Sequence, residues 1–127
     1  MFSTRLSSEA FARAVEAAMA DIPSALVPYM QDITIDVEPM PDDATCAAAG
    51  VRDRRTLLGL YQGTPLTLRG VDDSLRRPDR ITIYQRNIER MCRSRADVIR
   101  QIRKTVFHEV GHHFGLDEDD LADLGYQ

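Results

Sequence analysis

The chain has 127 residues, of which 43% are hydrophobic and 28% are charged, and its formal net charge is −4 at pH 7. These values exclude a disordered or fibrous chain and are typical of a folded globular protein. The length predicts a single domain over residues 1–127, large enough to bury a core without disulfides or a structural metal.

The sequence indicates a cytoplasmic protein. It has no run of about 18 apolar residues, the length that a membrane-spanning helix requires, so we expect no membrane partner. Charged residues interrupt the first part of the chain and disfavour a secretory signal or a transit peptide: Arg5, Glu9, Arg13 and Glu16. The two cysteines, Cys46 and Cys92, suggest no disulfide framework, and we expect reduced, partly buried thiols.

The first part of the chain predicts a helix, a strand and a loop. A helix is predicted from position 7 or 8 to Met19, because apolar residues recur there at helical spacing. A half-buried strand is predicted over 33–37, where Ile and Val alternate with Thr and Asp. Pro39 ends this strand, and the segment from Pro39 to Arg55 is predicted to be a loop because of its Pro, Asp, Ala and Gly content. Such a loop would be an active-site flap or a connector.

The second part predicts short strands followed by a long helix. The strands are expected at Leu57–Tyr61, Leu66–Leu68 and Ile81–Tyr84, the last after a turn-rich segment at Arg76–Arg80. Ser94 followed by Asp97 is a capping-box pattern. Apolar residues then recur at helical spacing: Val98, Ile99, Ile102, Val106, Val110 and Phe114.

Gly115 is a typical C-terminal cap for this helix, and the segment Leu116–Tyr126 is expected to form a short closing helix or turn. The elements together predict an α+β fold. Its three or four short strands pack on the long helix, with a helix at the N-terminus and a short helix at the C-terminus.

Basic residues precede an acidic C-terminal segment. The stretch 86–104 carries six arginines and Lys104, and five acids follow between Asp117 and Asp123. We interpret the basic stretch as a solvated helix face rather than as an anion-binding patch. No aromatic residues are interleaved with these arginines to stack on bases, so nucleic acid is not the expected partner.

All three histidines lie in one short segment of the predicted helix, His108-Glu109-Val110-Gly111-His112-His113. Residues four apart lie on one face of a helix, so His108 and His112 can direct their imidazoles at one metal ion. Glu109 beside them is placed to take a proton from a metal-bound water. His113 falls among the apolar residues of the helix and is predicted to be a packed, hydrogen-bonded core histidine.

Three segments together resemble the bacterial zincin-like family of minimal metallopeptidases. They are Leu-Gly-Leu-Tyr-Gln-Gly-Thr-Pro-Leu at 58–66, Pro-Asp-Arg-Ile-Thr-Ile-Tyr at 78–84, and His-Glu-Val-Gly-His-His-Phe-Gly-Leu at 108–116. The resemblance covers about the C-terminal two thirds of the chain. It implies a small zincin-like fold in which a short sheet lies over the active-site helix, a bound Zn²⁺ ion, and a peptide or protein substrate.

The last segment is also similar to the metzincin signature, which implies a third metal ligand three residues beyond Gly115. Glu118 occupies that place, where the related proteins usually carry His or Asp. No methionine follows Met91, so the methionine-containing turn of the metzincins is missing.

We predict Glu118 as the third ligand for two reasons. Gly115 can adopt the positive φ that turns the chain back. The glutamate stem is long enough to bring one oxygen to about 2.0–2.2 Å from zinc. Asp117, Asp119 and Asp120 are the alternative ligands, and a solvated, acidic helix N-terminus is the competing interpretation.

The predicted function is zinc-dependent peptide hydrolysis, with Glu109 as the general base and three metal ligands: His108, His112 and Glu118. Tyr84 and Tyr126 are candidate donors to the oxyanion. The strand Ile81–Tyr84 is a candidate edge for an extended peptide, because strand addition satisfies backbone groups whatever the side chains.

Two alternatives stay open. The first is a non-catalytic or latent metal- or peptide-binding protein, because a fold does not fix a function. The second is a metal-dependent endoribonuclease, whose phosphates the basic stretch would hold. Glu109, and the lack of any histidine after His113, disfavour the nuclease.

Overall fold

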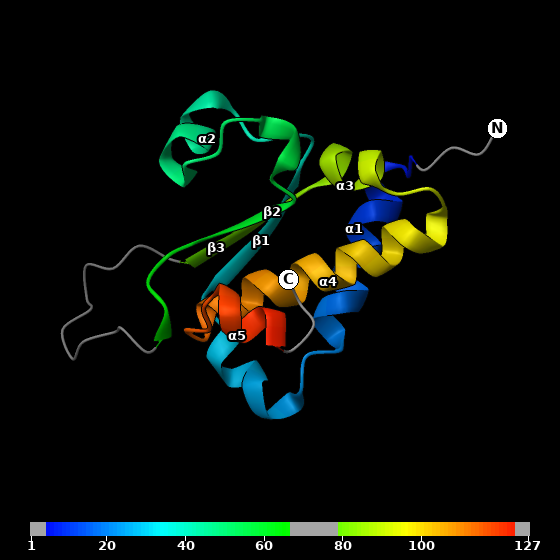
Figure 1. The fold of residues 1–127 in the computed structure, drawn as a ribbon. Helices are drawn as coiled ribbons and strands as arrows, with labels where there is room; N and C mark the ends of the chain where they lie inside the picture. The colour runs from blue at the N-terminus through cyan, green and yellow to red at the C-terminus, as the bar shows by residue number, and fades with distance from the viewer. Residues whose placement is uncertain (1–4, 67–78, 124–127) are drawn as a thin grey trace.

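The computed structural model describes residues 5–66 and 79–123, which form an α+β fold (Figure 1). A mixed sheet lies against the long helix α4 (Arg95–His113), and helix α1 (Ser8–Ala20) packs beside α4. The short helix α5 (Glu118–Asp123) lies over the C-terminal part of α4. The predicted fold class is confirmed, with three strands in the described part of the chain.

The sheet has the strand order β1-β3-β2. Strand β1 (Ile33–Glu38) pairs in parallel with β3 (Asp79–Tyr84), and β2 (Gly59–Gln62) pairs antiparallel with the other side of β3. The prediction that Ile81–Tyr84 offers an edge to a peptide is therefore wrong, because neighbours occupy both sides of β3. The outer strand next to α4 is β2, which starts two residues later than the sequence predicted.

Helix α4 is held by its cap and by one apolar face. The Ser94 hydroxyl accepts a hydrogen bond from the backbone N–H of Asp97 at 3.1 Å, which confirms the predicted cap. Ile99 is exposed, unlike the other apolar residues of the predicted stripe. The buried face joins one core with α1 and β3: Val98, Ile102, Val106 and Val110 with Phe11, Val15, Ile81 and Ile83. The opposite face of α4 is left for a pocket.

The predicted loop from Pro39 to Arg55 is wrong. This segment contains helix α2 (Asp43–Ala49) and the start of a 3₁₀ helix, η2 (Arg54–Thr56). The Asp42 carboxylate caps α2 by accepting from the backbone N–H of Thr45 at 2.7 Å, and Gly50 ends the helix at φ +70°. The Ala-rich run between these two caps favours helix over loop.

Two further elements were not foreseen: a 3₁₀ helix, η1 (Ser24–Met30), and helix α3 (Gln85–Met91). Leu66 is not in a strand, so the third predicted strand is not found at that residue. The rest of that strand, Thr67 and Leu68, and positions 76–78 of the predicted turn lie outside the described residues.

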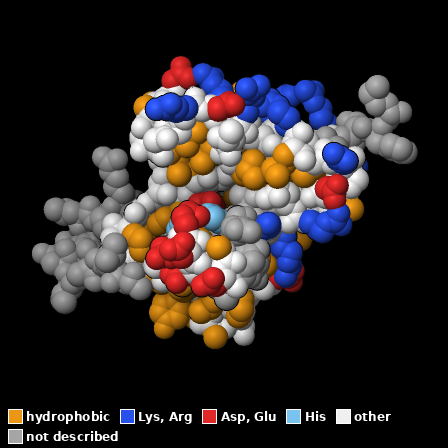
Figure 2. All heavy atoms as spheres, viewed as in Figure 1, with side chains coloured by type: hydrophobic (Ala, Val, Ile, Leu, Met, Phe, Trp, Pro, Cys, Tyr) orange, Lys and Arg blue, Asp and Glu red, His pale blue; other side chains and the backbone are white. Residues whose placement is uncertain are grey.

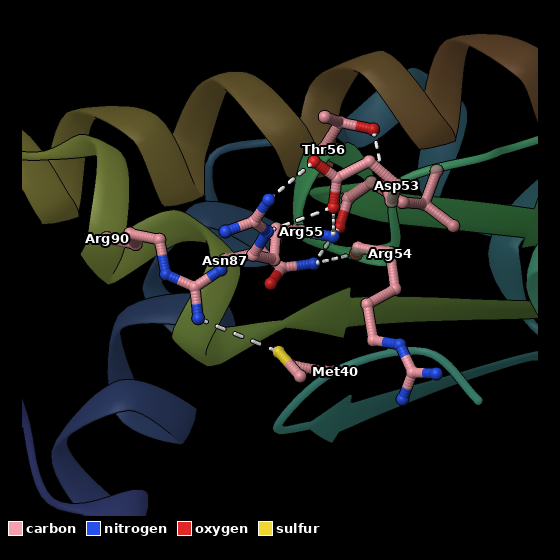
Figure 3. Close-up of polar contacts among 8 residues, drawn as sticks. Met40, Asp53, Arg54, Arg55, Thr56, Asn87 and Arg90 are labelled. Carbon is pink, nitrogen blue, oxygen red and sulfur yellow. Dashed lines mark hydrogen bonds and ion pairs between the residues drawn. The ribbon is translucent and has the colours of Figure 1, made fainter. Parts of the chain in front are cut away.

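Asn87 of α3 fixes the position of η2 (Figure 3). Its side chain is 1% exposed, and its amide N–H groups donate to the carbonyl oxygens of Arg54 and Leu57, both at 2.7 Å. The Asp53 carboxylate accepts from the backbone N–H of Arg55 at the start of η2. These bonds hold Thr56 and Leu57, which form part of the pocket rim.

Two minor expectations can be compared with the structure. No helix in the described ranges is both long enough and apolar enough to cross a membrane. Cys46 is buried and Cys92 is half-buried, and both are unpaired, as the sequence predicted.

Candidate metal centre

The structure brings together three side chains that the sequence predicted as ligands. These are His108, His112 and Glu118, which we call the cluster. His108 and His112 lie on successive turns of α4, with their Nε2 atoms 3.2 Å apart. Glu118, the first residue of α5, places Oε1 at 2.9 Å from Nε2 of His112 and Oε2 at 3.3 Å from Nε2 of His108. Within the described ranges this is the one group of His, Cys, Asp or Glu side chains whose ligand atoms gather closely enough to hold a metal ion.

These separations can be compared with the geometry of zinc. Tetrahedral ligands at about 2.0–2.1 Å from the ion lie about 3.3 Å from one another. The 3.2 Å between the two histidine nitrogens is close to that value, and each of these nitrogens has one oxygen of the Glu118 carboxylate at 2.9 or 3.3 Å. The Nδ1 atom of His112 lies 3.0 Å from the carbonyl oxygen of Leu116, which accepts its N–H and leaves the Nε2 lone pair directed at the cluster. The donor set therefore fits Zn²⁺.

The turn between α4 and α5 brings Glu118 to the histidines. Gly115 has φ +87°, a conformation that favours glycine, and it reverses the chain after α4. Gly111 lets α5 approach α4, since a Cβ atom there would lie 2.4 Å from Cδ2 of Leu121. A larger residue at position 111 would therefore force the Leu121 side chain of α5 to move.

The other acidic candidates have different contacts. Asp117 and Asp120 cap α5 reciprocally: the backbone N–H of each residue donates to the carboxylate of the other, at 3.0 and 2.8 Å. Neither these two nor Asp119 belongs to the cluster. The N-terminus of α5 is therefore acidic, as the competing interpretation expected. Among its acidic residues, Glu118 is the one whose carboxylate lies at the histidines.

Glu109 lies beside the cluster and is 7% exposed. Its Oε2 is 3.9 Å from Nε2 of His108. Burial raises the pKa of Glu109, while the two histidines and a hydrogen bond from the backbone of Tyr61 in β2 act in the opposite direction. The carboxylate is thus held between the edge strand and the histidines, in a position from which it can exchange a proton with a group at the cluster.

A cavity of about 400 Å³ gives access to these side chains. Residues 56–61, from the end of η2 into β2, form one wall, and half-buried and buried residues of α4 form the other. Figure 2 shows histidine atoms in a hollow beside the acidic side chains of α5, with hydrophobic side chains on the opposite rim. The open cluster, the buried carboxylate and the edge strand therefore face one space.

His113 points away from this cavity and is 1% exposed. Its Nδ1 lies 2.8 Å from Oδ2 of Asp79, which is fully buried at the start of β3, and its Nε2 lies 2.8 Å from the carbonyl oxygen of Tyr29. The Tyr61 hydroxyl donates to the same Asp79 oxygen at 3.0 Å. The prediction of a hydrogen-bonded core histidine is confirmed. The bonds of His113 and Tyr61 to Asp79 join the end of α4 to β3 and β2.

We predict that His113→Ala destabilises the fold by about 3–5 kcal/mol, because the buried Asp79 carboxylate loses the imidazole that lies 2.8 Å from it. Urea denaturation measures this loss. The double variant Asp79→Asn/His113→Ala should lose clearly less than the sum of the two single losses, since the uncompensated charge is then gone. A loss below about 1 kcal/mol for His113→Ala would show that the pair contributes little.

One of the two predicted oxyanion donors, Tyr84, does not lie at the site. Tyr84 is 2% exposed and does not line the cavity, and burial raises its pKa to about 12. Tyr84 is therefore a packing residue and that prediction is wrong, while Tyr126 lies outside the described residues. The sequence analysis did not identify Asp79. A buried histidine needs hydrogen-bond acceptors, and this requirement is the signal that points to such a partner.

A short sheet thus lies over a helix with two histidines, and an acidic side chain completes a cluster that could hold a metal ion. The model of the family described as zincin-like metallopeptidase matches residues 30–126. The chain therefore belongs to the zincin-like metallopeptidase family, as the resemblance implied. A comparison with curated proteins gave no match.

Proposed function

We propose that this protein is a zinc-dependent peptidase in which His108, His112 and Glu118 hold the metal and Glu109 is the general base. The observation that carries the proposal is the cluster itself: the two histidine nitrogens lie 3.2 Å apart, and the Glu118 carboxylate places one oxygen at 2.9 Å from one of them and the other oxygen at 3.3 Å from the second, in a cavity that Glu109 also lines. Family membership supports the same chemistry.

The chain's own residues account for the proton transfers. Zinc, when bound, supplies a Lewis acid that activates water and polarises the scissile carbonyl. The Glu109 carboxylate takes a proton from the attacking water and returns it to the leaving amine. Its place beside His108, 3.9 Å from the ring nitrogen, puts it within reach of a water held at the cluster.

Strand β2 is suited to hold the peptide substrate. It pairs with β3 on one side, and its other side borders the cavity. In an antiparallel pair, alternate residues direct their backbone groups outward, and Gly59 and Tyr61 take these positions because Leu58 bonds to Tyr84. The backbone N–H of Tyr61 bonds to Glu109, so Gly59 is the position of this edge that we propose for the peptide. An extended peptide that adds to this edge lies across the cavity and above the histidines.

The proposal is tested by metal analysis beside a peptide-cleavage assay. We expect one zinc ion per chain and cleavage that stops when a chelator removes the ion. Bound zinc without cleavage of any peptide would favour a non-catalytic binding protein, and cleavage of RNA instead of peptides would favour the nuclease.

We predict that Glu118→Ala weakens zinc binding by more than about 10-fold, because one of three protein ligands is lost. Asp119→Ala is the matched control: it removes the same charge from the next residue, and Asp119 does not belong to the cluster. Asp117→Ala and Asp120→Ala should change zinc affinity only a few-fold, through the lost cap of α5. A large loss in one of these two, with Glu118→Ala unaffected, would place the ligand elsewhere.

A further inference from the structure

The cavity at the cluster continues along α4. A second cavity of about 230 Å³ lies toward α3 and is lined by Met91, Cys92, Asp97 and Arg100. Gln101 and Lys104 line both cavities, so the two spaces meet at these side chains. We call these two adjoining cavities the groove; together they follow α4 from Glu118, past the histidines, to Asp97 and Arg100.

Lys104 lies on the same face of α4 as the cluster. The α4 residues that line the first cavity follow helical spacing: Gln101, Lys104, Thr105, His108, Glu109 and His112. Lys104 precedes His108 by four residues, so it stands about 6 Å along the helix axis from the first histidine. A substrate at the cluster that extends toward α3 must pass its ammonium group.

Lys104 differs from the other basic residues of this stretch in its surroundings. It is half-buried, whereas the six arginines of the stretch 86–104 are exposed. Arg100 pairs with Asp97, and Arg103 pairs with Asp21. Among the described residues Lys104 forms no ion pair, and it is the only cationic side chain that lines the first cavity.

The two ends of the groove carry different charged groups. The end at α5 carries Glu118, a metal ligand in the proposed function, and Figure 2 shows acidic side chains gathered beside the histidine atoms. The other end carries Lys104, with the ion-paired Arg100 beyond it. Beyond the metal ligands, an anionic group that extends along the groove toward α3 is attracted by the ammonium of Lys104.

We propose that Lys104 binds a carboxylate of the substrate and makes this protein selective for peptides that carry one on the α3 side of the scissile bond. This inference rests on the proposed function and names the substrate class. The bond is charge-assisted, with the ammonium of Lys104 donating to the carboxylate oxygens. The carboxylate is that of an acidic side chain or that of the peptide's C-terminus, and the test separates these sources.

The test measures binding without turnover. Zinc-loaded Glu109→Gln protein is titrated into fluorescent peptides that differ only in Glu against Gln at each position, and in a free against an amidated C-terminus. We expect one carboxylate to tighten binding about 10-fold, as a charge-assisted hydrogen bond does. A Glu-specific gain identifies a side-chain carboxylate, and a gain with the free terminus identifies the terminal one.

Variants at position 104 then test whether Lys104 causes this preference for a carboxylate. Added to the Glu109→Gln background, Lys104→Gln should abolish the preference, Lys104→Arg should retain most of it, and Lys104→Glu should reverse it. The control is Arg95→Gln, which removes an exposed cation of α4 that lines neither cavity.

Equal binding of every matched pair, or a preference that survives Lys104→Gln, would overturn this inference, as would failure of all the peptides to bind. Failure of the proposed function would give a different result. Wild-type protein with bound zinc would then cleave no peptide, and the binding preference would persist.

Discussion

His112→Ala should lower zinc affinity by more than about 100-fold, because it removes a nitrogen ligand from a set of three protein groups. Loss of a partner that only orients a ligand already costs about 10–100-fold, so loss of the ligand itself costs more. Competition with a chromophoric chelator measures the affinity. The substitution also removes the bond from Nδ1 to the carbonyl oxygen of Leu116 at the end of α4.

The effect must come from the metal and not from unfolding. Thermal unfolding of the metal-free proteins separates the two, because His112 is half-buried and its loss should leave the apolar core intact. His112→Cys, which supplies a thiolate at the same position, should recover part of the affinity. Equal zinc content in wild type and His112→Ala, measured under the same dialysis, would contradict the assignment.

Glu109→Gln should retain zinc and lose hydrolysis by about 10²–10⁴-fold in kcat, because the amide preserves the shape of the side chain but cannot accept a proton. The residue is 7% exposed and receives a hydrogen bond from the backbone of Tyr61, so the amide fills the same space. Stopped assays on one identified peptide, with zinc content determined on the same samples, measure the ratio.

A second substitution, Glu109→Asp, tests whether the position of the carboxylate also matters for hydrolysis. Glu109→Asp keeps the carboxylate but shortens the stem, so it should bind zinc normally and recover only part of the rate. Cleavage by Glu109→Gln at the wild-type rate would show that another group accepts the proton.

Local signals in the sequence were sufficient for α1, β1 and α4. The Ser94 cap, the apolar spacing and Gly115 each concern neighbouring residues, and each appears in the structure as predicted. The proximity of His108 and His112 could be predicted in the same way, because residues four apart on a helix share a face. The position of Gly115 also favoured Glu118, whose carboxylate lies at the histidines.

Pairings between distant segments could not be predicted in this way. The alternation in β1 indicates a strand but not its neighbour, and nothing local distinguishes the central β3 from the outer β2. The contact between Asp79 and His113 joins residues far apart in the chain, so it depends on the finished fold. The helix α2 was missed for another reason, because Pro and Gly around it outweighed the cap at Asp42.

Digestion of a peptide library during a zinc titration tests the central claim most directly. The metal-free protein receives zinc in steps, and mass spectrometry follows the fragments while zinc binding is measured on the same samples. The account predicts that fragments appear in proportion to bound zinc, reach a maximum at one ion per chain, and disappear when a chelator is added. An intact library with one zinc ion bound per chain, or fragments that form equally without zinc, would contradict it.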